Sequence, residues 1–174
     1  MQSPKQFGVA LLDTNVLDYA FKARTKLLAS QLLERLVNNY ELAISEYLRF
    51  EIYRGLKMSS IPSVKPLVDS FNAYTVDKAT IDLAAALTTC YERDEATHKN
   101  RGGFSDGDIL MAATAIINRL VIVTANRADF PAPYFNELRK HTYTDAKGKP
   151  WVFYELKHDI LYLNAMLEIC YPTK

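Results

Sequence analysis

Cysteine and histidine are scarce in this sequence, with two cysteines and three histidines among 174 residues. There is no CxxC pair and no Cys/His cluster, which excludes the usual structural zinc sites. Cys90 and Cys170 each lie in apolar, helix-forming sequence, so we expect two buried free thiols rather than a disulfide. We assign no catalytic role to His98, His141 or His158, because none of them lies in the acidic motifs described below.

Long apolar runs and an excess of one charge are also missing. No stretch is long and apolar enough to span a membrane, and residues 1–8 lack the apolar core of a signal peptide, so we expect a cytoplasmic protein without membrane association. The formal net charge is only +1. A protein that binds nucleic acid through its overall charge usually has a clear basic excess. Any contact with nucleic acid must therefore come from local patches or from a metal ion.

Short apolar segments alternate with segments of helical periodicity over most of the chain. Buried strands are predicted over residues 8–12, 41–44, 73–76 and 120–124. Helices are predicted over 27–36, 45–53, 62–71, 77–91 and 106–118, with Ser45 and Asp77 as N-caps. Residues 93–105 are polar and aperiodic, as in a long loop. This alternation predicts the α/β class, with a central, mostly parallel sheet flanked by helices.

The pattern changes after residue 129. An aromatic-rich hairpin is predicted over 142–156, with its turn at Lys147-Gly148, followed by a last helix over 157–169. We expect residues 1–135 to form the main domain. Residues 136–174 would be a C-terminal hairpin and helix packed on that same domain.

Acidic residues stand where the ligands of an α/β sheet bind, beyond the carboxyl ends of the strands. Asp13 directly follows the first strand, and Asp106 and Asp108 open the helix that precedes the last parallel strand. Asn126 and Asp129 follow that strand. Each residue also has a simpler interpretation as a helix cap or turn residue. Glu51, on the helix after the second strand, would by itself be typical of a solvated helix position.

The combination of these acids is more informative than any one of them. Carboxylates that converge at one sheet edge repel one another, and their pKa values rise unless a cation neutralises them. A ligand set of oxygen atoms without His or Cys indicates Mg²⁺ or Mn²⁺. Such an ion activates water and stabilises the charge that builds on a phosphodiester oxygen.

Four motifs, in this order, resemble the PIN-domain family and in particular the VapC-type toxins. They are Leu11-Leu-Asp-Thr-Asn15; Ile44-Ser45 followed by Glu51-Ile-Tyr-Arg-Gly55; Asp108-Ile-Leu-Met-Ala-Ala-Thr-Ala115; and Ile122-Val-Thr-Ala-Asn-Arg-Ala-Asp-Phe130. The resemblance implies a three-layer PIN-like fold and a metal site made of Asp13, Glu51 and Asp108. The fourth ligand would be Asp129, with Asn126 as the alternative. Residues that would support these acids by hydrogen bonds are Thr14, Asn15, Ser45, Thr124, Asn126 and, as a cap or supporting group, Asp106.

The resemblance further implies endonucleolytic cleavage of RNA, in which water attacks the phosphorus in line and metal offsets the charge on the leaving oxygen. It also implies a small VapB-like antitoxin as partner, and a homodimer. Basic residues near the motifs are candidates for RNA contact: Arg24, Arg54, Arg101 and Arg127. The chain departs from compact VapC toxins in the residues after Phe130, which could widen the sheet, cover the dimer surface or contact RNA.

Three other functions share some of these sequence features. Phosphatases of the haloacid dehalogenase type also place Asp after the first strand, but they need a second Asp at the position of Asn15. PIN-like nucleases that cut DNA flaps or structured RNA usually carry a helical arch, and no clear arch insertion is present in the sequence. A catalytically silent PIN fold that binds RNA or a protein stays open as the alternative.

Overall fold

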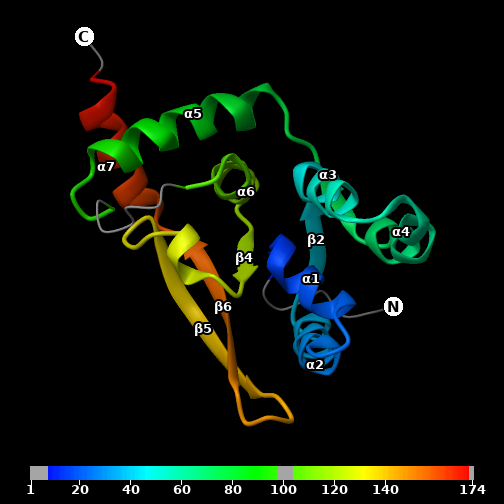
Figure 1. Cartoon of the computed structure of the whole chain (residues 1–174). Helices are drawn as coiled ribbons and strands as arrows, with labels where there is room; N and C mark the ends of the chain where they lie inside the picture. Colours follow the sequence, from blue (N-terminus) through cyan, green and yellow to red (C-terminus); the bar gives the residue numbers. More distant parts are fainter. Residues whose placement is uncertain (1–7, 98–103, 173–174) are drawn as a thin grey trace.

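A computed structural model describes residues 8–97 and 104–172, and within these ranges the fold is built on one six-stranded sheet (Figure 1). The strand order is β3-β2-β1-β4-β6-β5. The strands are β1 (Val9–Leu12), β2 (Glu41–Ser45), β3 (Asn72–Tyr74), β4 (Val121–Thr124), β5 (Phe135–Thr144) and β6 (Pro150–His158). The first four pair in parallel, while β6 pairs antiparallel with both β4 and β5. The α/β class and the mostly parallel sheet are therefore confirmed.

Helices cover both faces of the sheet, which gives three layers (Figure 1). Their bounds are α1 (Thr14–Phe21), α2 (Lys26–Val37), α3 (Glu46–Gly55), α4 (Ile61–Asp69), α5 (Lys78–Arg93), α6 (Asp106–Ile117) and α7 (Ile160–Cys170), with short 3₁₀ turns η1 (Met58–Ser60) and η2 (Arg127–Asp129). Side chains alternate between the faces, as strand geometry requires. Leu11 and Ile122 pack with α5, α6 and α7, whereas Leu12 and Val123 pack with α1 to α4.

Two of the expected N-caps are confirmed, and a third is wrong. The side chain of Ser45 accepts a hydrogen bond from Leu48 N, and that of Asp77 accepts one from Thr80 N, so both residues are the N-caps expected. The expectation that Asp106 caps α6 is wrong, because Ser105 is the N-cap and Asp106 is the first helical residue. A serine preceding two acids competes well for this position, and its small side chain reaches back to the helix amides.

The C-terminal hairpin is longer than predicted and is part of the central sheet. Its arms pair from Phe135 with His158 to Thr144 with Pro150, rather than over residues 142–156 alone. The first part of β5 is mostly exposed and polar because it runs along the sheet edge. It therefore lacks the alternation of apolar and polar residues that predicts a strand. Helix α7 starts at Ile160 rather than at residue 157, because β6 continues to His158 and Asp159 caps the helix.

Two further expectations were that both cysteines are buried free thiols and that no segment crosses a membrane. Cys90 and Cys170 are buried free cysteines, as predicted. Among the helices in the described part of the chain, none has the length and apolar character needed to cross a membrane.

Candidate active site

Strands β1 and β4 lie side by side, and the residues that follow them are joined by hydrogen bonds. Asp13 N donates to Val123 O at 2.9 Å, which places Asp13 at the carboxyl end of the sheet. Asp13 is only 6% exposed. Its Oδ2 accepts a hydrogen bond from Thr124 Oγ1 at 2.6 Å and another from the Asn15 amide. A buried carboxylate held in this way has one defined orientation.

Asn15 and Thr124 act together as the support predicted for Asp13. Asn15 Oδ1 accepts from Ala125 N at 2.9 Å, while its amide also donates to Thr124 Oγ1 at 3.2 Å. Thr124 Oγ1 in turn accepts from Asn126 N at 2.9 Å. These bonds tie the start of α1 to the loop after β4, and they fix the position of the Asp13 side chain.

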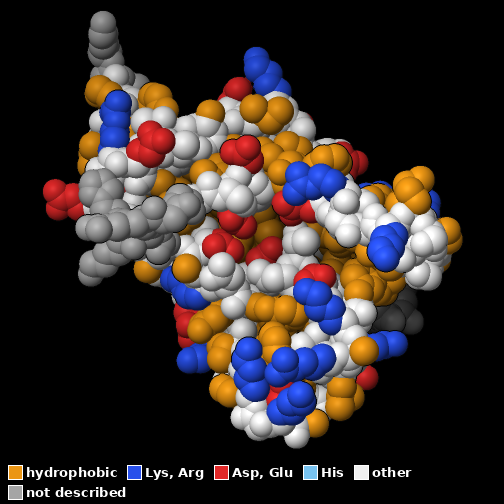
Figure 2. Space-filling model, viewed as in Figure 1, with side chains coloured by type: hydrophobic (Ala, Val, Ile, Leu, Met, Phe, Trp, Pro, Cys, Tyr) orange, Lys and Arg blue, Asp and Glu red, His pale blue; other side chains and the backbone are white. Residues whose placement is uncertain are grey.

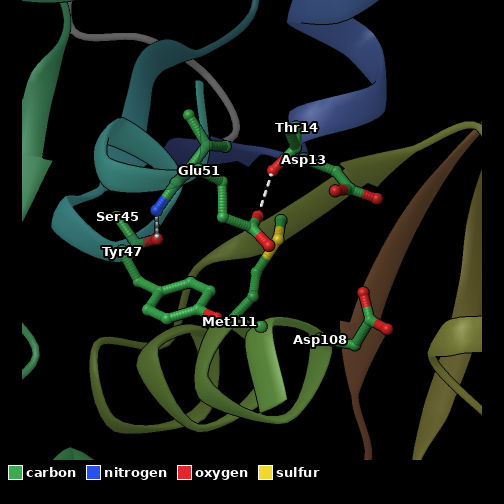
Figure 3. Close-up of a pocket in the computed structure, with 9 residues that line it drawn as sticks. Asp13, Thr14, Ser45, Tyr47, Glu51, Asp108 and Met111 are labelled. Atoms are coloured by element: carbon green, nitrogen blue, oxygen red, sulfur yellow. Dashed lines mark hydrogen bonds between the residues drawn. The ribbon is translucent and has the colours of Figure 1, made fainter. Parts of the chain in front are cut away.

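Glu51 approaches the same pocket from α3. Its Oε2 accepts a 2.7 Å hydrogen bond from Thr14 Oγ1, which lies next to Asp13 in the chain (Figure 3). The start of α6 passes very close to it at Gly107. A Cβ atom at Gly107 would lie 2.8 Å from Tyr47 Cε1 and 3.0 Å from Glu51 Oε1, so any larger residue there would push against both side chains. A larger residue at this position would therefore displace the Tyr47 and Glu51 side chains from where they line the pocket.

Asp108 closes the pocket from the first turn of α6. Its Oδ2 accepts from Ser105 Oγ at 2.6 Å and from Ser105 N at 3.2 Å, which forms a capping box with the helix start. Asp108 thus stabilises the start of α6 and also lines the pocket. From the sequence, a capping role and a role in the site were alternatives for this residue. Asp106 is exposed and lines a separate apolar groove between α5 and α6.

One pocket gathers three of the four predicted acids, which come from three separate elements (Figure 3). Its lining residues are Asp13, Thr14, Ser45, Tyr47, Leu48, Glu51, Gly107, Asp108 and Met111. Sequence reasoning did not single out Tyr47, Leu48, Gly107 or Met111. Gly107 carried a usable signal, since a glycine between two helix-start acids is unusual unless something packs closely there.

Asp129 lies outside that lining but interacts electrostatically with it. Burial raises the pKa of Asp129 to about 7, and the negative charges of Asp108 and Asp13 add to the rise. Burial likewise raises the pKa of Asp13 to about 6, with a further contribution from Asp108, although the Thr124 hydrogen bond opposes it. Asn126 is exposed and donates to Asp129 Oδ1 at 2.8 Å, so it contacts Asp129 and not the pocket acids. Ionised carboxylates here repel one another and favour a nearby cation.

The donor atoms suit a hard divalent cation. Within residues 8–97 and 104–172, no group of three or more His, Cys, Asp or Glu side chains is close enough together to hold a metal ion. Mg²⁺ is usually bound through one or two protein carboxylates, with water and substrate phosphates completing its shell, so it does not require a closed protein cage. The carboxylate and hydroxyl oxygens in the lining and the mutual repulsion of the acids fit such an ion.

The predicted RNA-contact arginines have different surroundings. Arg54 is exposed near the end of α3. Arg127 is partly buried and donates to two main-chain carbonyls. Arg24 pairs with an acid of the C-terminal hairpin. Arg101 lies outside the described residues. Figure 2 shows acidic side chains in a hollow near the middle of this face, and several Lys and Arg side chains below it.

Comparison with known proteins adds a family match. The family model for the PIN domain matches residues 10–136. Ribonuclease VapC19 of Mycobacterium tuberculosis is 34% identical over 104 residues, which cover 59% of this chain and 78% of that protein. A toxin–antitoxin complex from Klebsiella pneumoniae contains a similar structure, with 26% identity, a TM-score of 0.58, and coverage of 71% of this chain and 92% of that chain. VapBC2 from Rickettsia felis, solved on a promoter DNA fragment, has 21% identity, a TM-score of 0.54, and coverage of 68% and 87%, which supports the fold alone.

Proposed function

Because the chain belongs to the PIN-domain family, we propose that it is an endoribonuclease that uses Mg²⁺ or Mn²⁺ to hydrolyse RNA phosphodiester bonds. The relative named a ribonuclease supports the reaction, and its 34% identity extends over 78% of that protein. We further propose that the chain is the toxin of a toxin–antitoxin pair. The similar structure from Klebsiella pneumoniae is a toxin–antitoxin complex, which supports an antitoxin as partner, and a homodimer remains part of the proposal.

The observation that carries this proposal is the convergence of Asp13, Glu51 and Asp108 on one pocket at the carboxyl end of the sheet. Residues so far apart in the chain come together only through the fold. Burial, together with the charges of Asp108 and Asp13, raises the pKa of Asp129 to about 7. This charge coupling makes Asp129 the better candidate than Asn126 for the fourth position of the site.

The chain's own residues orient the reacting groups. Thr14 holds one Glu51 oxygen, while Thr124 and Asn15 hold one Asp13 oxygen. The side-chain hydrogen bonds from these supporting residues reach Oε2 of Glu51 and Oδ2 of Asp13, so Oε1 and Oδ1 are the oxygens that would face a cation. When bound, such an ion offsets the repulsion of the acids, activates water and stabilises the charge that builds on the phosphodiester oxygens. The rigid support reduces the reorganisation that the site would need during the reaction.

A cleavage assay tests the proposal. The full chain is incubated with labelled single-stranded RNA, with Mg²⁺ or with EDTA, alongside the variants Asp13→Asn and Asp82→Asn. Asp82 is exposed on α5, outside the pocket lining, and gives a matched control for loss of one carboxylate. We expect cleavage with Mg²⁺ only, a loss of roughly 100-fold or more in Asp13→Asn, and wild-type cleavage in Asp82→Asn. Equal cleavage by wild type and Asp13→Asn would overturn the proposal. RNA binding without cleavage by either protein would favour the silent binding module.

A further inference from the structure

Basic residues concentrate where the tip of the C-terminal hairpin meets the connection between α1 and α2. Segments 18–26 and 145–151 together contain five Lys or Arg and two Asp, a net charge of +3, although the whole chain has only +1. We call this the hairpin-tip surface and define it by its cations: Lys22, Arg24, Lys26, Lys147 and Lys149. Figure 2 shows Lys and Arg side chains gathered at the bottom of the molecule, where Figure 1 places the hairpin tip and α2.

Asp145 holds the two segments together. Its carboxylate accepts hydrogen bonds from the main-chain amides of Lys147 and Lys149 at 2.9 and 3.0 Å. It also accepts from Trp151 Nε1 at 3.3 Å, and from the Arg24 guanidinium at 3.0 and 3.3 Å. These donors hold the pKa of the Asp145 carboxyl well below its usual range. One acid therefore orders the hairpin turn and anchors it to the residues after α1, at a fixed geometry.

Two cations of the hairpin-tip surface, Arg24 and Lys149, lie near the Trp151 ring but remain open to solvent. Lys149 Nζ lies 4.8 Å from the Trp151 ring centroid, and the Arg24 guanidinium lies 5.9 Å from it. The Arg24 side chain is still 54% exposed. Within the described residues, Lys147 and Lys149 have no ion-pair partner, so their ammonium groups are available to an anion. Trp151 packs against Tyr19 with ring centroids 5.0 Å apart, so it supports the cations and is not a free platform for a base.

Helix α1 connects the candidate pocket to the hairpin-tip surface. Helix α1 begins at Thr14, next to Asp13, and ends at Phe21, next to Lys22. Eight helical residues span about 12 Å, so a short stretch of single-stranded nucleic acid would be long enough to reach from one site to the other. Figure 2 shows the acidic hollow and the basic side chains on the same face.

We propose that the hairpin-tip surface binds the phosphate backbone of single-stranded RNA that extends from the catalytic pocket. This inference rests on the proposed nuclease function, because a phosphodiester in the pocket must have neighbouring nucleotides that leave over an adjacent surface. The pocket itself is acidic, so it attracts a polyanion poorly, and the cations needed to bind the rest of the strand stand on the hairpin. The segment beyond the family match thereby supplies substrate affinity, since the match ends at residue 136.

Binding is measured by fluorescence anisotropy of a labelled single-stranded RNA oligonucleotide, using the full chain in EDTA so that no metal-dependent cleavage occurs. The test variant is Lys147→Glu/Lys149→Glu. The control is Lys57→Glu/Lys78→Glu, which changes the charge equally at two exposed lysines on other elements. Lys26→Glu, from the other segment, gives a second test that does not alter the hairpin turn.

Loss of two phosphate contacts should weaken binding roughly ten- to thirtyfold at about 0.1 M salt and lower the salt slope by about 1.4. Lys26→Glu should weaken binding in the same direction, while the control should bind like wild type. Equal weakening in test and control variants would overturn the proposal, because only overall charge would matter. The proposal would also be overturned if the test variant bound RNA like wild type but lost binding of labelled poly-glutamate. That result would assign the hairpin-tip surface to an acidic protein segment. Since EDTA removes catalysis from this assay, a failed cleavage assay and a failed binding assay are distinguishable.

Discussion

Thr14 Oγ1 donates a 2.7 Å hydrogen bond to Glu51 Oε2, and this bond connects the first residue of α1 to the middle of α3. Thr14 follows Asp13 directly, so the bond sets the position of one pocket acid relative to another. A glutamate has three rotatable side-chain bonds, and without this partner its carboxylate would sample several positions at the pocket.

Replacing Thr14 with valine should therefore lower kcat/KM for RNA cleavage by roughly tenfold, the usual size of a lost partner of a metal-binding carboxylate. Valine keeps the shape of threonine but cannot donate to Glu51. Thr14→Ser, which keeps the hydroxyl, should retain most activity. Steady-state kinetics with Mg²⁺ would be compared with melting temperatures. Equal loss of activity in both variants, or a melting temperature that falls in step with activity, would contradict a positioning role.

Divalent metal should stabilise the wild-type protein against heat. The acids of the pocket repel one another when ionised, and a bound cation removes that repulsion. At ten times its dissociation constant, Mg²⁺ should contribute about 1.4 kcal/mol, which for a chain of this length raises the melting temperature by about 3–6 °C.

Asp13→Asn should abolish most of this metal effect, since it removes one ligand and part of the repulsion. Asp82→Asn, on the exposed face of α5, should respond to Mg²⁺ like wild type. Differential scanning fluorimetry over a range of Mg²⁺ concentrations measures both responses. A shift that is as large in Asp13→Asn as in wild type would place the cation elsewhere.

Asp129 and Asn126 should contribute unequally to RNA cleavage and to Mg²⁺ binding. Asp129 is coupled by charge to Asp108 and Asp13, whereas the Asn126 side chain donates to Asp129 and accepts from Ala128 N at 3.3 Å. We expect Asp129→Asn to lower kcat/KM by about tenfold or more and to weaken Mg²⁺ binding. Asn126→Ala should cause a smaller loss, because it removes two exposed hydrogen bonds that contribute only about 0.5–1.5 kcal/mol each and touch none of the pocket acids directly. A larger loss in Asn126→Ala, measured in the same assay, would reverse the assignment of the fourth position.

The parallel part of the sheet was predictable because its strands are short, apolar and separated by helices of clear period. Strand β4 (Val121–Thr124), for example, is buried at every position, so its central place follows from composition alone. The edge strand β5 was largely missed, since its exposed polar residues look like a loop until β6 pairs with them. Pairing between distant segments is a tertiary property that local pattern does not record.

The same distinction applies to the candidate site. Asp13 could be placed because it directly follows a buried strand, whereas the supporting roles of Thr14 and Asn15 came from the resemblance to the PIN-domain family. Glu51 could not be placed from periodicity, because its place at the pocket depends on how α3 crosses the start of α6 at Gly107. Ser105 was missed for a similar reason: its importance lies in the hydrogen bonds to Asp108, which a pattern of loop residues does not show.

A buried polar triad, made of Tyr40 and two residues of the hairpin, gives the last prediction, which concerns the stability of the fold and not catalysis. Glu155 is 1% exposed, and its two oxygens lie 2.7 Å from Tyr40 Oη and 2.7 Å from His141 Nε2. Burial favours a raised pKa for Glu155, but the hydrogen bonds from His141 and Tyr40, together with the charge of Arg139, outweigh it and lower the pKa. Folding thus favours the ionised form of Glu155 over its protonated form.

Glu155→Gln should lower the free energy of unfolding by roughly 2–3 kcal/mol at pH 7, because the neutral amide replaces two hydrogen bonds to a charged group with weaker neutral ones. A lowered pKa contributes stability that is fully present above the ordinary value of 4.5 and is lost as the pH falls through the folded value. The difference between wild type and Glu155→Gln, measured by urea unfolding from pH 7 to pH 3, should therefore shrink below about pH 4.5. Glu168→Gln, exposed on α7, should match wild type throughout. A difference that stays constant or grows as the pH falls would show that the carboxylate is not held in its ionised form.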